Sequence, residues 1–280
     1  MFQYAAGKAL AEFHGVEFKI DISGFKEYKE HGYFLDKLAI SAPAAGEDEI
    51  APFLKYKPPS GRILKLGLEK FDFLIPYKNK KIFFEPYFNF NRRFFKLPSN
   101  IYLSGYFQSE KYFKNIEAVI RKEFVLKEET SEVYKILADD VNGVNSVSIH
   151  FRRGDYITNQ GLNKVFGTPS LDYYYAAVKK IAETTKDPRF FIFSNDIEWV
   201  KNNFKIAFPV TYILGPSIKN YEEISLMSKC RHNIIANSSF SWWGAWLNNH
   251  SDKIVIAPAR WLQWKRINTK DVVPTNWEKM

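Results

Sequence analysis

The stretch "SVSIHFRRGDY", residues 146–156, joins a short alternating run to two adjacent arginines and an aspartate. Its first half predicts a β-strand over 146–151. Side chains alternate between the two faces of a strand, so His150 and Arg152 are expected on the same face. Arg153 then begins the loop that follows. The strand would therefore deliver an imidazole and a guanidinium to the carboxyl end of a sheet.

Short apolar segments alternate with amphipathic ones throughout the second half of the chain. Further strands are predicted over 189–194, 209–214, 233–237 and 253–258, and helices over 170–184, 196–204, 220–230 and 239–249. This alternation, with continuously apolar strands, is typical of a parallel sheet covered on both faces. Such a sheet binds its ligand beyond the carboxyl ends of its strands. We therefore expect a Rossmann-like, doubly wound domain over residues 141–280.

The first half of the chain is less regular. Its pattern predicts a helix over 1–13 ended by Gly15, a strand over 16–21, and a helix over 109–124 opened by Ser109. Residues 41–100, rich in proline, phenylalanine and lysine, predict short helices and loops, with the acidic "EDE" at 47–49 in a loop. A polar helical stretch over 125–142 marks the expected junction, which gives an N-terminal α/β domain over residues 1–140.

Composition narrows the class of protein. The 280 residues are 46% hydrophobic and 17% aromatic, enough for two folded domains. One cysteine, Cys230, permits neither an internal disulfide nor a cysteine-rich zinc site. No apolar run approaches the roughly 18–20 residues of a membrane span, and the N-terminus lacks a secretory pattern. A cytoplasmic protein is expected, and its net charge of +9 indicates an anionic partner.

The arginine pair is a candidate phosphate site. A guanidinium group matches phosphate oxygens in bidentate fashion, which an ammonium group does not. Gly154 would free the backbone of the loop, and Asp155 would hold one guanidinium in place. The alternative is a solvated Arg–Asp pair on the surface. This stretch alone does not decide between the two.

A second candidate cluster follows the next predicted strand, in "FIFSNDIEW". Ser194, Asn195 and Asp196 stand where that strand meets a helix, and any of them could simply cap the helix. The functional alternative is that Asp196 accepts a hydrogen bond from the base or ribose of a nucleotide, as carboxylates at such strand ends do in other parallel sheets.

A third cluster lies in "IIANSSFSWWGAWL", where four polar residues crowd one turn before a helix: Asn237, Ser238, Ser239 and Ser241. Free N–H groups and the helix dipole make that position an anion site. Capping needs one such residue, and this turn has four. The tryptophans that follow are expected to pack against the sheet rather than to stack on a ligand.

Several motifs are absent from the sequence. It contains no Asp-x-Asp pair, Walker A loop, G-x-S-x-G elbow or zinc spacing, and the five histidines show no metal-binding spacing. No basic helix or aromatic sheet motif of a nucleic-acid binder is present either. We therefore expect no metal and no cofactor, so that protein groups alone neutralise a bound phosphate.

Five stretches together resemble the bacterial α-1,2-fucosyltransferases of glycosyltransferase family 11. They are "MFQYAAGKALA" (1–11), "LSGYFQSEKYF" (103–113), "HFRRGDY" (150–156), "FSNDIEWVKNNF" (193–204) and "ANSSFSWWGAWLN" (236–248). The resemblance implies a GT-B-like fold of two Rossmann-like domains. It also implies an inverting enzyme that needs no metal and moves fucose from GDP-fucose to the 2-hydroxyl of a galactose-containing acceptor, in glycan or O-antigen synthesis.

The resemblance also implies roles for individual residues. Arg152 resembles the main ligand of the donor β-phosphate, supported by Arg153 and His150, and Asp196 resembles a contact to the GDP nucleoside. Asn237 and the turn of Ser238, Ser239, Phe240 and Ser241 resemble the phosphate-binding turn. The catalytic base is left open between Asp155 and His150, either of which could instead only orient the arginines.

The N-terminal domain is expected to bind the acceptor, which would be an oligosaccharide or a lipid-linked glycan, through the phenylalanine-rich stretch 71–113. In the family a Gly-Gly-Leu-Gly-Asn-Gln stretch stands directly before "MFQYA". The expectation is thus that this domain lacks its first strand and the glycine-rich loop.

Two alternative functions stay open. One is fucosyl transfer with another linkage or acceptor, because the sequence specifies the donor site better than the acceptor site. The other is a non-catalytic glycan-binding protein, which would explain the aromatic residues but would not need the arginine pair together with the serine-rich turn. The positive charge adds the hypothesis of peripheral attachment to the inner membrane face.

Overall fold

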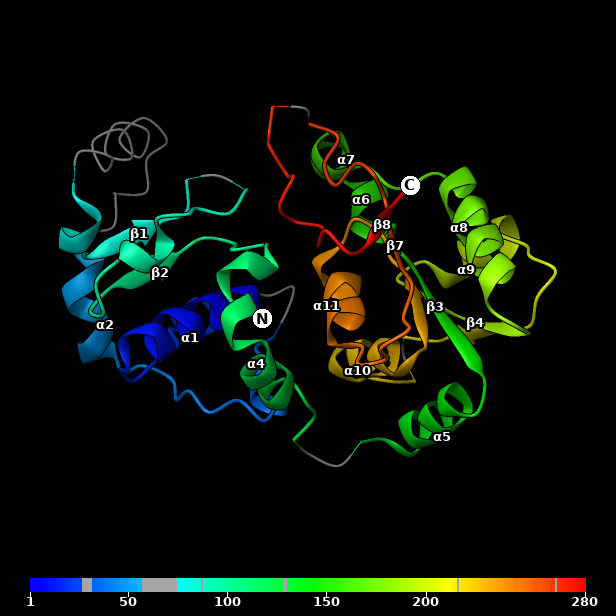
Figure 1. Cartoon of the computed structure of the whole chain (residues 1–280), viewed down its shortest axis with the longest axis horizontal. Coiled ribbons are helices and arrows are strands. Elements are labelled where there is room, and N and C mark those ends of the chain that lie inside the picture. Colours follow the sequence, from blue (N-terminus) through cyan, green and yellow to red (C-terminus); the bar gives the residue numbers. More distant parts are fainter. Residues whose placement is uncertain (27–31, 57–74, 87, 128–129, 216, 265) are drawn as a thin grey trace. The chain divides into compact units, whose positions relative to one another are not determined.

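A computed structural model describes residues 1–26, 32–56, 75–86, 88–127, 130–215, 217–264 and 266–280 (Figure 1). The chain divides into two compact units. The N-terminal unit comprises Met1–Glu123 and Lys270–Val272, and the C-terminal unit comprises Phe124–Thr269 and Val273–Met280. The division thus falls after residue 123, earlier than the expected boundary at residue 140. Within the described residues, none of the helices combines the length and apolar composition that a bilayer crossing requires.

The C-terminal unit is built on a six-stranded parallel sheet. Its strands are β3 (Asn145–Phe151), β4 (Pro188–Ser194), β5 (Val210–Ile213), β6 (His232–Ile234), β7 (Val255–Ala257) and β8 (Glu278–Lys279). They lie in the order β5-β4-β3-β6-β7-β8, with every neighbouring pair parallel. The strand order reverses between β3 and β6, as in dinucleotide-binding folds. The predicted Rossmann-like sheet is confirmed, and the two-residue β8 is an addition to it.

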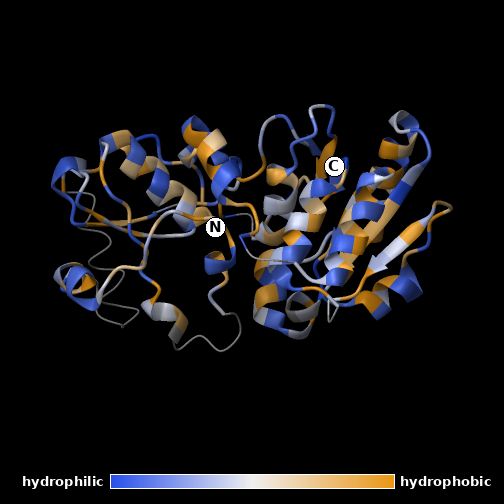
Figure 2. Ribbon diagram, turned by 90° about the horizontal axis from the view of Figure 1, so that it is seen from below, coloured by the Kyte–Doolittle hydropathy of each residue, from blue (hydrophilic) through white to orange (hydrophobic). Residues whose placement is uncertain are grey.

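Helices cover both faces of this sheet. They are α5 (Glu132–Asn142), α6 (Gly154–Thr158), α7 (Gln160–Phe166), α8 (Leu171–Thr184), α9 (Ile197–Asn203), α10 (Asn220–Lys229) and α11 (Ser239–Leu247). Helices α8 and α9 pack with β3 and β4 in one apolar cluster, while α5 and α10 pack with β4 and β5 in another. Figure 2 shows hydrophobic and hydrophilic residues side by side on these helices, as expected of elements buried on one face. The short helices α6 and α7 were not predicted.

The two faces of β3 differ as the sequence predicts. Val147, Ile149 and Phe151 lie in the apolar cluster with α8. On the opposite face the hydroxyl of Ser148 accepts a hydrogen bond of 2.8 Å from the side-chain amide of Asn233 on the neighbouring strand. Since both faces are buried, a one-residue slip of β3 would exchange apolar and polar side chains, and its register is fixed accordingly.

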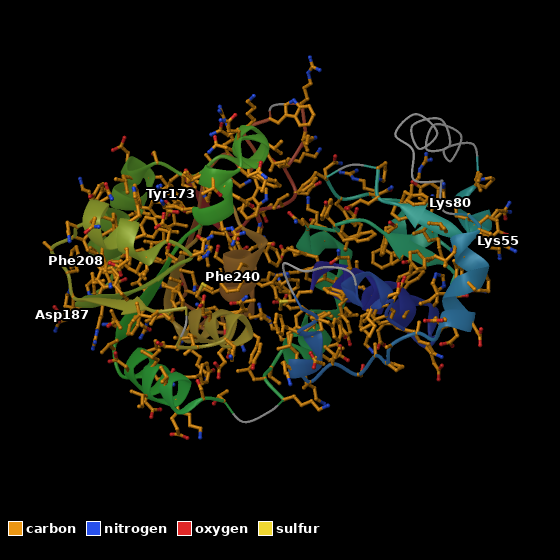
Figure 3. The ribbon with its side chains drawn as sticks, turned by 180° about the vertical axis from the view of Figure 1, so that it is seen from behind. Lys55, Lys80, Tyr173, Asp187, Phe208 and Phe240 are labelled. Carbon is orange, nitrogen blue, oxygen red and sulfur yellow. The ribbon has the colours of Figure 1, made fainter. Side chains whose placement is uncertain are left out.

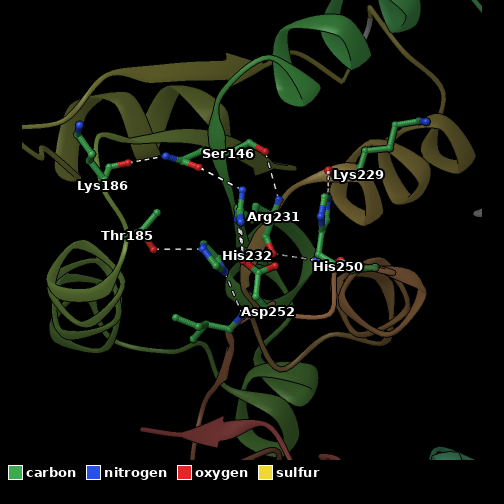
Figure 4. A network of polar contacts seen from close by, with 11 residues as sticks. Ser146, Thr185, Lys186, Lys229, Arg231, His232, His250 and Asp252 are labelled. Atoms are coloured by element: carbon green, nitrogen blue, oxygen red, sulfur yellow. Dashed lines mark hydrogen bonds and ion pairs between the residues drawn. The ribbon is translucent and has the colours of Figure 1, made fainter.

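A polar network lies at the amino end of the sheet (Figure 4). The imidazole Nδ1 of His232 accepts from the backbone N–H of Ile254 (3.0 Å), so its Nε2 donates to the hydroxyl of Thr185 (3.1 Å). Burial lowers the pKa of His232, which agrees with a neutral ring. Arg231 and Asp252 form an ion pair beside it. This network secures the sheet at the edge opposite to the predicted ligand site.

The N-terminal unit contains fewer regular elements. Among its described residues, the helices are α1 (Phe2–His14), α2 (Glu47–Leu54) and α4 (Glu117–Glu123), and β1 (Ile82–Phe84) pairs in parallel with β2 (Tyr102–Ser104). Short 3₁₀ turns occupy Ser23–Lys26, Leu35–Lys37, Tyr77–Asn79, Phe94–Lys96, Glu110–Tyr112 and Lys114–Ile116. Helix α1 ends at Gly15 as predicted, with a left-handed φ of 64° that suits glycine.

Three predictions for this unit are wrong. Residues 16–21 form no strand: Ile20 makes only an isolated bridge to Ala44, since the adjacent Pro43 has no N–H to extend a ladder. The acidic residues 47–49 form the first turn of α2, where the helix dipole favours negative charge. The helix expected over 109–124 begins as two 3₁₀ turns, which are separated by Phe113 with its non-helical φ of −139°. Ser109 does cap the first of these turns.

Residues Lys270–Val272 belong to the N-terminal unit although the chain on both sides of them belongs to the C-terminal one. The buried carboxylate of Asp271 holds them there. It accepts a hydrogen bond of 3.0 Å from the backbone N–H of Phe90 and forms an ion pair with Lys111.

Helices α10 and α11 approach closely at Gly244, which yields a stability prediction. A Cβ on Gly244 would lie 2.7 Å from Cβ of Met227. Alanine normally stabilises a helix by about 1 kcal/mol over glycine. Here the overlap should reverse that sign, and we expect Gly244→Ala to lower the free energy of unfolding by about 1–3 kcal/mol in urea denaturation.

The matched control is Gly143→Ala at the end of α5, where φ is −79° and no contact is shorter than 3.4 Å. Its stability should change little. A Gly244→Ala protein at least as stable as the wild type would contradict the close packing of the two helices.

Candidate active site

The predicted site residues of the C-terminal unit gather at the carboxyl edge of its sheet. Arg152 and Arg153 follow β3, Asp196 follows β4, and the turn 237–241 follows β6. Strands β3 and β6 are neighbours, and the strand order reverses between them. Crevices at such a reversal are where open parallel sheets bind ligands. The arginine pair and the serine-rich turn therefore flank the position where the fold itself predicts a ligand.

His150 is the last polar side chain of β3 before the arginines. It is buried, and its ring centroid lies 5.5 Å from that of Phe240 in the first turn of α11, labelled in Figure 3. Its Nδ1 is buried without a hydrogen-bond partner among the described residues. Burial, together with the charge of Arg152, lowers the pKa of His150 to about 3. The ring is thus neutral near pH 7 and offers one donor and one acceptor nitrogen.

Arg152 lies against a pair of stacked aromatic rings. Its guanidinium carbon is 5.2 Å from the ring centroid of Tyr156, which stacks in turn on Phe166 with centroids 4.9 Å apart. Tyr156 belongs to α6 and Phe166 ends α7. A guanidinium that lies over an aromatic face keeps its charge and is attracted by the ring. These two short helices therefore help to fix where Arg152 points.

Arg153 is held by the loop that follows β4. Its Nε lies 3.3 Å from a carboxylate oxygen of Asp196, and its guanidinium carbon lies 3.2 Å from the ring centroid of Trp199. Asp196 makes no side-chain capping hydrogen bond to α9, so the capping alternative does not apply to it. In this structure Asp196 orients Arg153. Trp199, which the sequence analysis did not assign, stands three residues after Asp196 and so lies on the same side of α9.

Asn195 explains why a glycine follows the arginines. Its side-chain oxygen accepts a hydrogen bond of 2.9 Å from the backbone N–H of Arg153. A Cβ on Gly154 would collide with the Asn195 amide group. Gly154 is therefore required by the close approach of Asn195, which sequence analysis treated only as one of three capping candidates.

Asn237 ties together the segments around the site. Its amide nitrogen donates to the backbone carbonyls of Phe166 (2.9 Å), Gly167 (3.2 Å) and Trp261 (3.2 Å). Its side-chain oxygen is buried without a partner among the described residues. Because its donor group is already engaged, Asn237 positions the end of α7 in this structure, and only its oxygen remains for a ligand.

In the serine-rich turn, two hydroxyl groups make hydrogen bonds within the protein and one is exposed to solvent. Ser238 caps α11 by accepting from the N–H of Phe240 (3.3 Å), and the buried Ser241 hydroxyl donates to the Ser238 carbonyl (3.4 Å). Ser239 is exposed. The first turn of α11 thus presents the Ser239 hydroxyl and the positive end of the helix dipole at the edge of the sheet, which suits an anion.

The side chain of Asp155 lies outside the described part of the structure, so its place at the site is a prediction. Among the residues that the structure describes, no group of three histidine, cysteine, aspartate or glutamate side chains is placed to hold a metal ion.

Several known proteins of related sequence are glycosyltransferases. The chain is 34% identical over 289 residues to an alpha-1,2-colitosyltransferase of Escherichia coli, an alignment that covers 100% of this chain and 94% of that protein. It is 45% identical over 119 residues to the O-antigen biosynthesis glycosyltransferase WbnK of the same species, covering 42% and 39%. Human galactoside alpha-(1,2)-fucosyltransferase 1 is 30% identical over 156 residues, covering 52% and 42%.

Among solved structures, the NodZ alpha-1,6-fucosyltransferase crystal soaked with GDP-fucose is similar in fold. Its TM-score is 0.55 at 12% sequence identity, and the match covers 88% of this chain and 87% of that one. This likeness supports the GT-B-like α/β fold. The sequence model of glycosyl transferase family 11 matches residues 33–280. The chain therefore belongs to glycosyl transferase family 11.

Proposed function

We propose that this glycosyltransferase moves fucose from GDP-fucose to the 2-hydroxyl of a galactoside acceptor, with inversion and without a metal ion, during glycan or O-antigen synthesis. One observation carries the proposal: Arg152 and Arg153 directly follow β3, and the first turn of α11 follows the neighbouring strand β6, at the edge where the strand order reverses. Guanidinium groups and a helix N-terminus both suit a phosphate at such an edge.

The chemistry of glycosyl transfer fits such a site. As the sugar leaves, positive charge builds on its anomeric carbon and negative charge on the departing GDP. Donors already in place at the β-phosphate stabilise that charge without reorganisation. We assign this role chiefly to Arg152, with Arg153 and the Ser239 hydroxyl beside it.

His150 is assigned to hydrogen bonding rather than to proton abstraction. A general base works best when its pKa lies near the operating pH, and the pKa of His150 is lowered to about 3. Its unpartnered Nδ1 is instead available to the donor or to the phosphate. Asp155 is then the remaining candidate of the two for accepting the proton of the acceptor hydroxyl.

A second candidate sugar is colitose. The relative aligned over the whole of this chain is named an alpha-1,2-colitosyltransferase. Colitose lacks one hydroxyl of fucose, so discrimination between the two donors would come from the pocket around the sugar and not from the diphosphate site. Parallel assays with the two GDP-sugars decide between them. A product that forms only with the colitose donor would overturn the fucosyl assignment and leave the phosphate site intact.

The acceptor is assigned to the N-terminal unit. There the Tyr106 ring is 63% exposed and lies 5.8 Å from the ring of Phe88, centroid to centroid. Exposed aromatic faces of this kind suit the apolar face of a sugar, and a non-catalytic glycan-binding protein would use them equally well. Turnover of a GDP-sugar in the presence of a galactoside separates an enzyme from such a binding protein.

Nucleotide selectivity tests the proposed donor. In a thermal-shift panel with GDP, UDP and CMP, we expect GDP alone to raise the melting temperature, and to do so equally with and without EDTA. Equal stabilisation by UDP, or loss of the GDP effect with EDTA, would contradict a metal-independent GDP-sugar enzyme.

Arg152→Ala tests the leaving-phosphate site. Loss of one preorganised donor typically costs about 3–4 kcal/mol in the transition state, so kcat should fall a hundredfold or more while the protein stays folded. Arg152→Lys should also lose most activity, because an ammonium group cannot bind phosphate in bidentate fashion. Arg231→Ala, at the opposite end of the sheet, is the charge-matched control and should keep wild-type kcat. An Arg152→Ala enzyme with a tenth of wild-type kcat would refute the assignment.

We also propose peripheral attachment to acidic membranes, on the basis of the net charge of +9. The protein should sediment with anionic liposomes at low salt and be released at high salt, because such attraction is screened. A protein that stays in the supernatant at low salt would contradict this.

A further inference from the structure

Three carboxylates of the C-terminal unit stand where β4 and β5 end at the ligand-binding edge: Asp196, Glu222 and Glu223. Their surroundings differ sharply. Asp196 is paired with Arg153. Glu222 is buried, and its two oxygens accept from the backbone N–H groups of Ser131 and Lys219, both at 2.8 Å. Two of the three carboxylates are therefore already engaged by the protein.

Glu223 has no such partner. Among the described residues no hydrogen bond or ion pair reaches its carboxylate, although the side chain is partly buried. A Cβ on Gly215 would lie 3.7 Å from Glu223 Oε1, so the carboxylate faces the loop between β5 and α10. Burial raises the pKa of Glu223 to about 7. A partly buried carboxylate without a partner lowers the stability of the folded protein. Such groups are more common at ligand-binding and catalytic sites than elsewhere.

Independent observations at the same edge also indicate a ligand-binding site. His150 Nδ1 and Asn237 Oδ1 are buried without partners, and these side chains are only 4% and 3% exposed. Buried polar atoms are rarely left unpaired in a folded protein. These two atoms lie at the ends of β3 and β6, beside the proposed phosphate site.

The position of Glu223 matches the reach of a nucleotide. Neighbouring strands lie about 4.8 Å apart, so the end of β5 is about 10 Å from the end of β3. The nucleoside of a diphosphate held at β3 and β6 can therefore reach the end of β5 when it extends past β4. A carboxylate there repels phosphate oxygens but accepts hydrogen bonds from a pair of neighbouring donors.

We propose that the Glu223 carboxylate accepts two adjacent hydrogen-bond donors of the nucleoside in the bound nucleoside diphosphate. Guanine presents such a pair in its N1–H and 2-amino groups, and ribose presents one in its 2′- and 3′-hydroxyls. The inference rests on the proposed function, since it names the part of the donor that this edge of the site recognises. The family resemblance implies a nucleoside contact for Asp196 as well, which in this structure is paired with Arg153.

Titration calorimetry with three nucleotides in EDTA tests the proposal. GDP carries both donor pairs, IDP lacks the 2-amino group, and 2′-deoxy-GDP lacks the 2′-hydroxyl. Glu223→Gln should weaken GDP binding about tenfold to hundredfold, because a hydrogen bond to a charged group is lost. Glu198→Gln on the neighbouring helix α9, where the exposed glutamate pairs only with Lys201 among the described residues, should bind GDP within twofold of the wild type.

The analogues identify the group that Glu223 contacts. The wild type should lose affinity for one analogue, and Glu223→Gln should no longer distinguish that analogue from GDP. Loss of discrimination against IDP places the carboxylate on the base, and loss of discrimination against 2′-deoxy-GDP places it on the ribose. Glu223→Gln should also melt at the same or a higher temperature at pH 8, because it removes a partly buried charge, whereas a structural role would lower the melting temperature.

Two results would overturn the inference. One is unchanged GDP affinity in Glu223→Gln. The other is a loss of affinity for both analogues, relative to GDP, that is the same in the wild type and in Glu223→Gln. Failure of the proposed function looks different: the wild-type protein itself would bind no GDP.

Discussion

The register of β3 is the constraint on which the site depends. The strand is buried on both faces, with Val147, Ile149 and Phe151 against α8 and Ser148 bonded to Asn233 on the other side. It lies at the reversal of the strand order, next to β6. Its last residues therefore emerge at the edge position where open parallel sheets of this kind bind ligands. A shift by one residue would turn His150 toward the apolar cluster and remove Arg152 from the crevice.

Around that fixed strand, the neighbouring loops act mainly to hold the arginines. Asn195 accepts from the backbone of Arg153, and Asp196 and Trp199 hold its guanidinium from two sides. Asn237 fastens the end of α7, whose Phe166 stacks on the Tyr156 ring beneath Arg152. Much of the polar sequence near the site therefore fixes geometry, which is what stabilising a developing charge requires.

The C-terminal sheet could be predicted well from the sequence. Short, continuously apolar segments that alternate with helices are typical of a parallel sheet buried on both faces. The placement of five strands, the faces of β3 and the gathering of three polar clusters at one edge are all confirmed. Helices α6 and α7 were missed because the segment 154–166 carries little apolar periodicity and contains two glycines. In the N-terminal unit, contacts distant in sequence override local pattern, as at Ile20 beside Pro43 and at the buried Phe113. Pairings such as Arg153 with Asp196 arise from tertiary structure, so residue types alone could not reveal them.

We propose that the protein itself, through Arg152 and the first turn of α11, receives the phosphate of the departing nucleotide. A crystal structure of the protein grown with GDP and EDTA tests this most directly. We predict the β-phosphate between the Arg152 guanidinium and the N–H groups at the start of α11, with no cation on the diphosphate. A diphosphate bound away from the edge of β3 and β6, or one that binds only when a divalent cation is supplied, would contradict it.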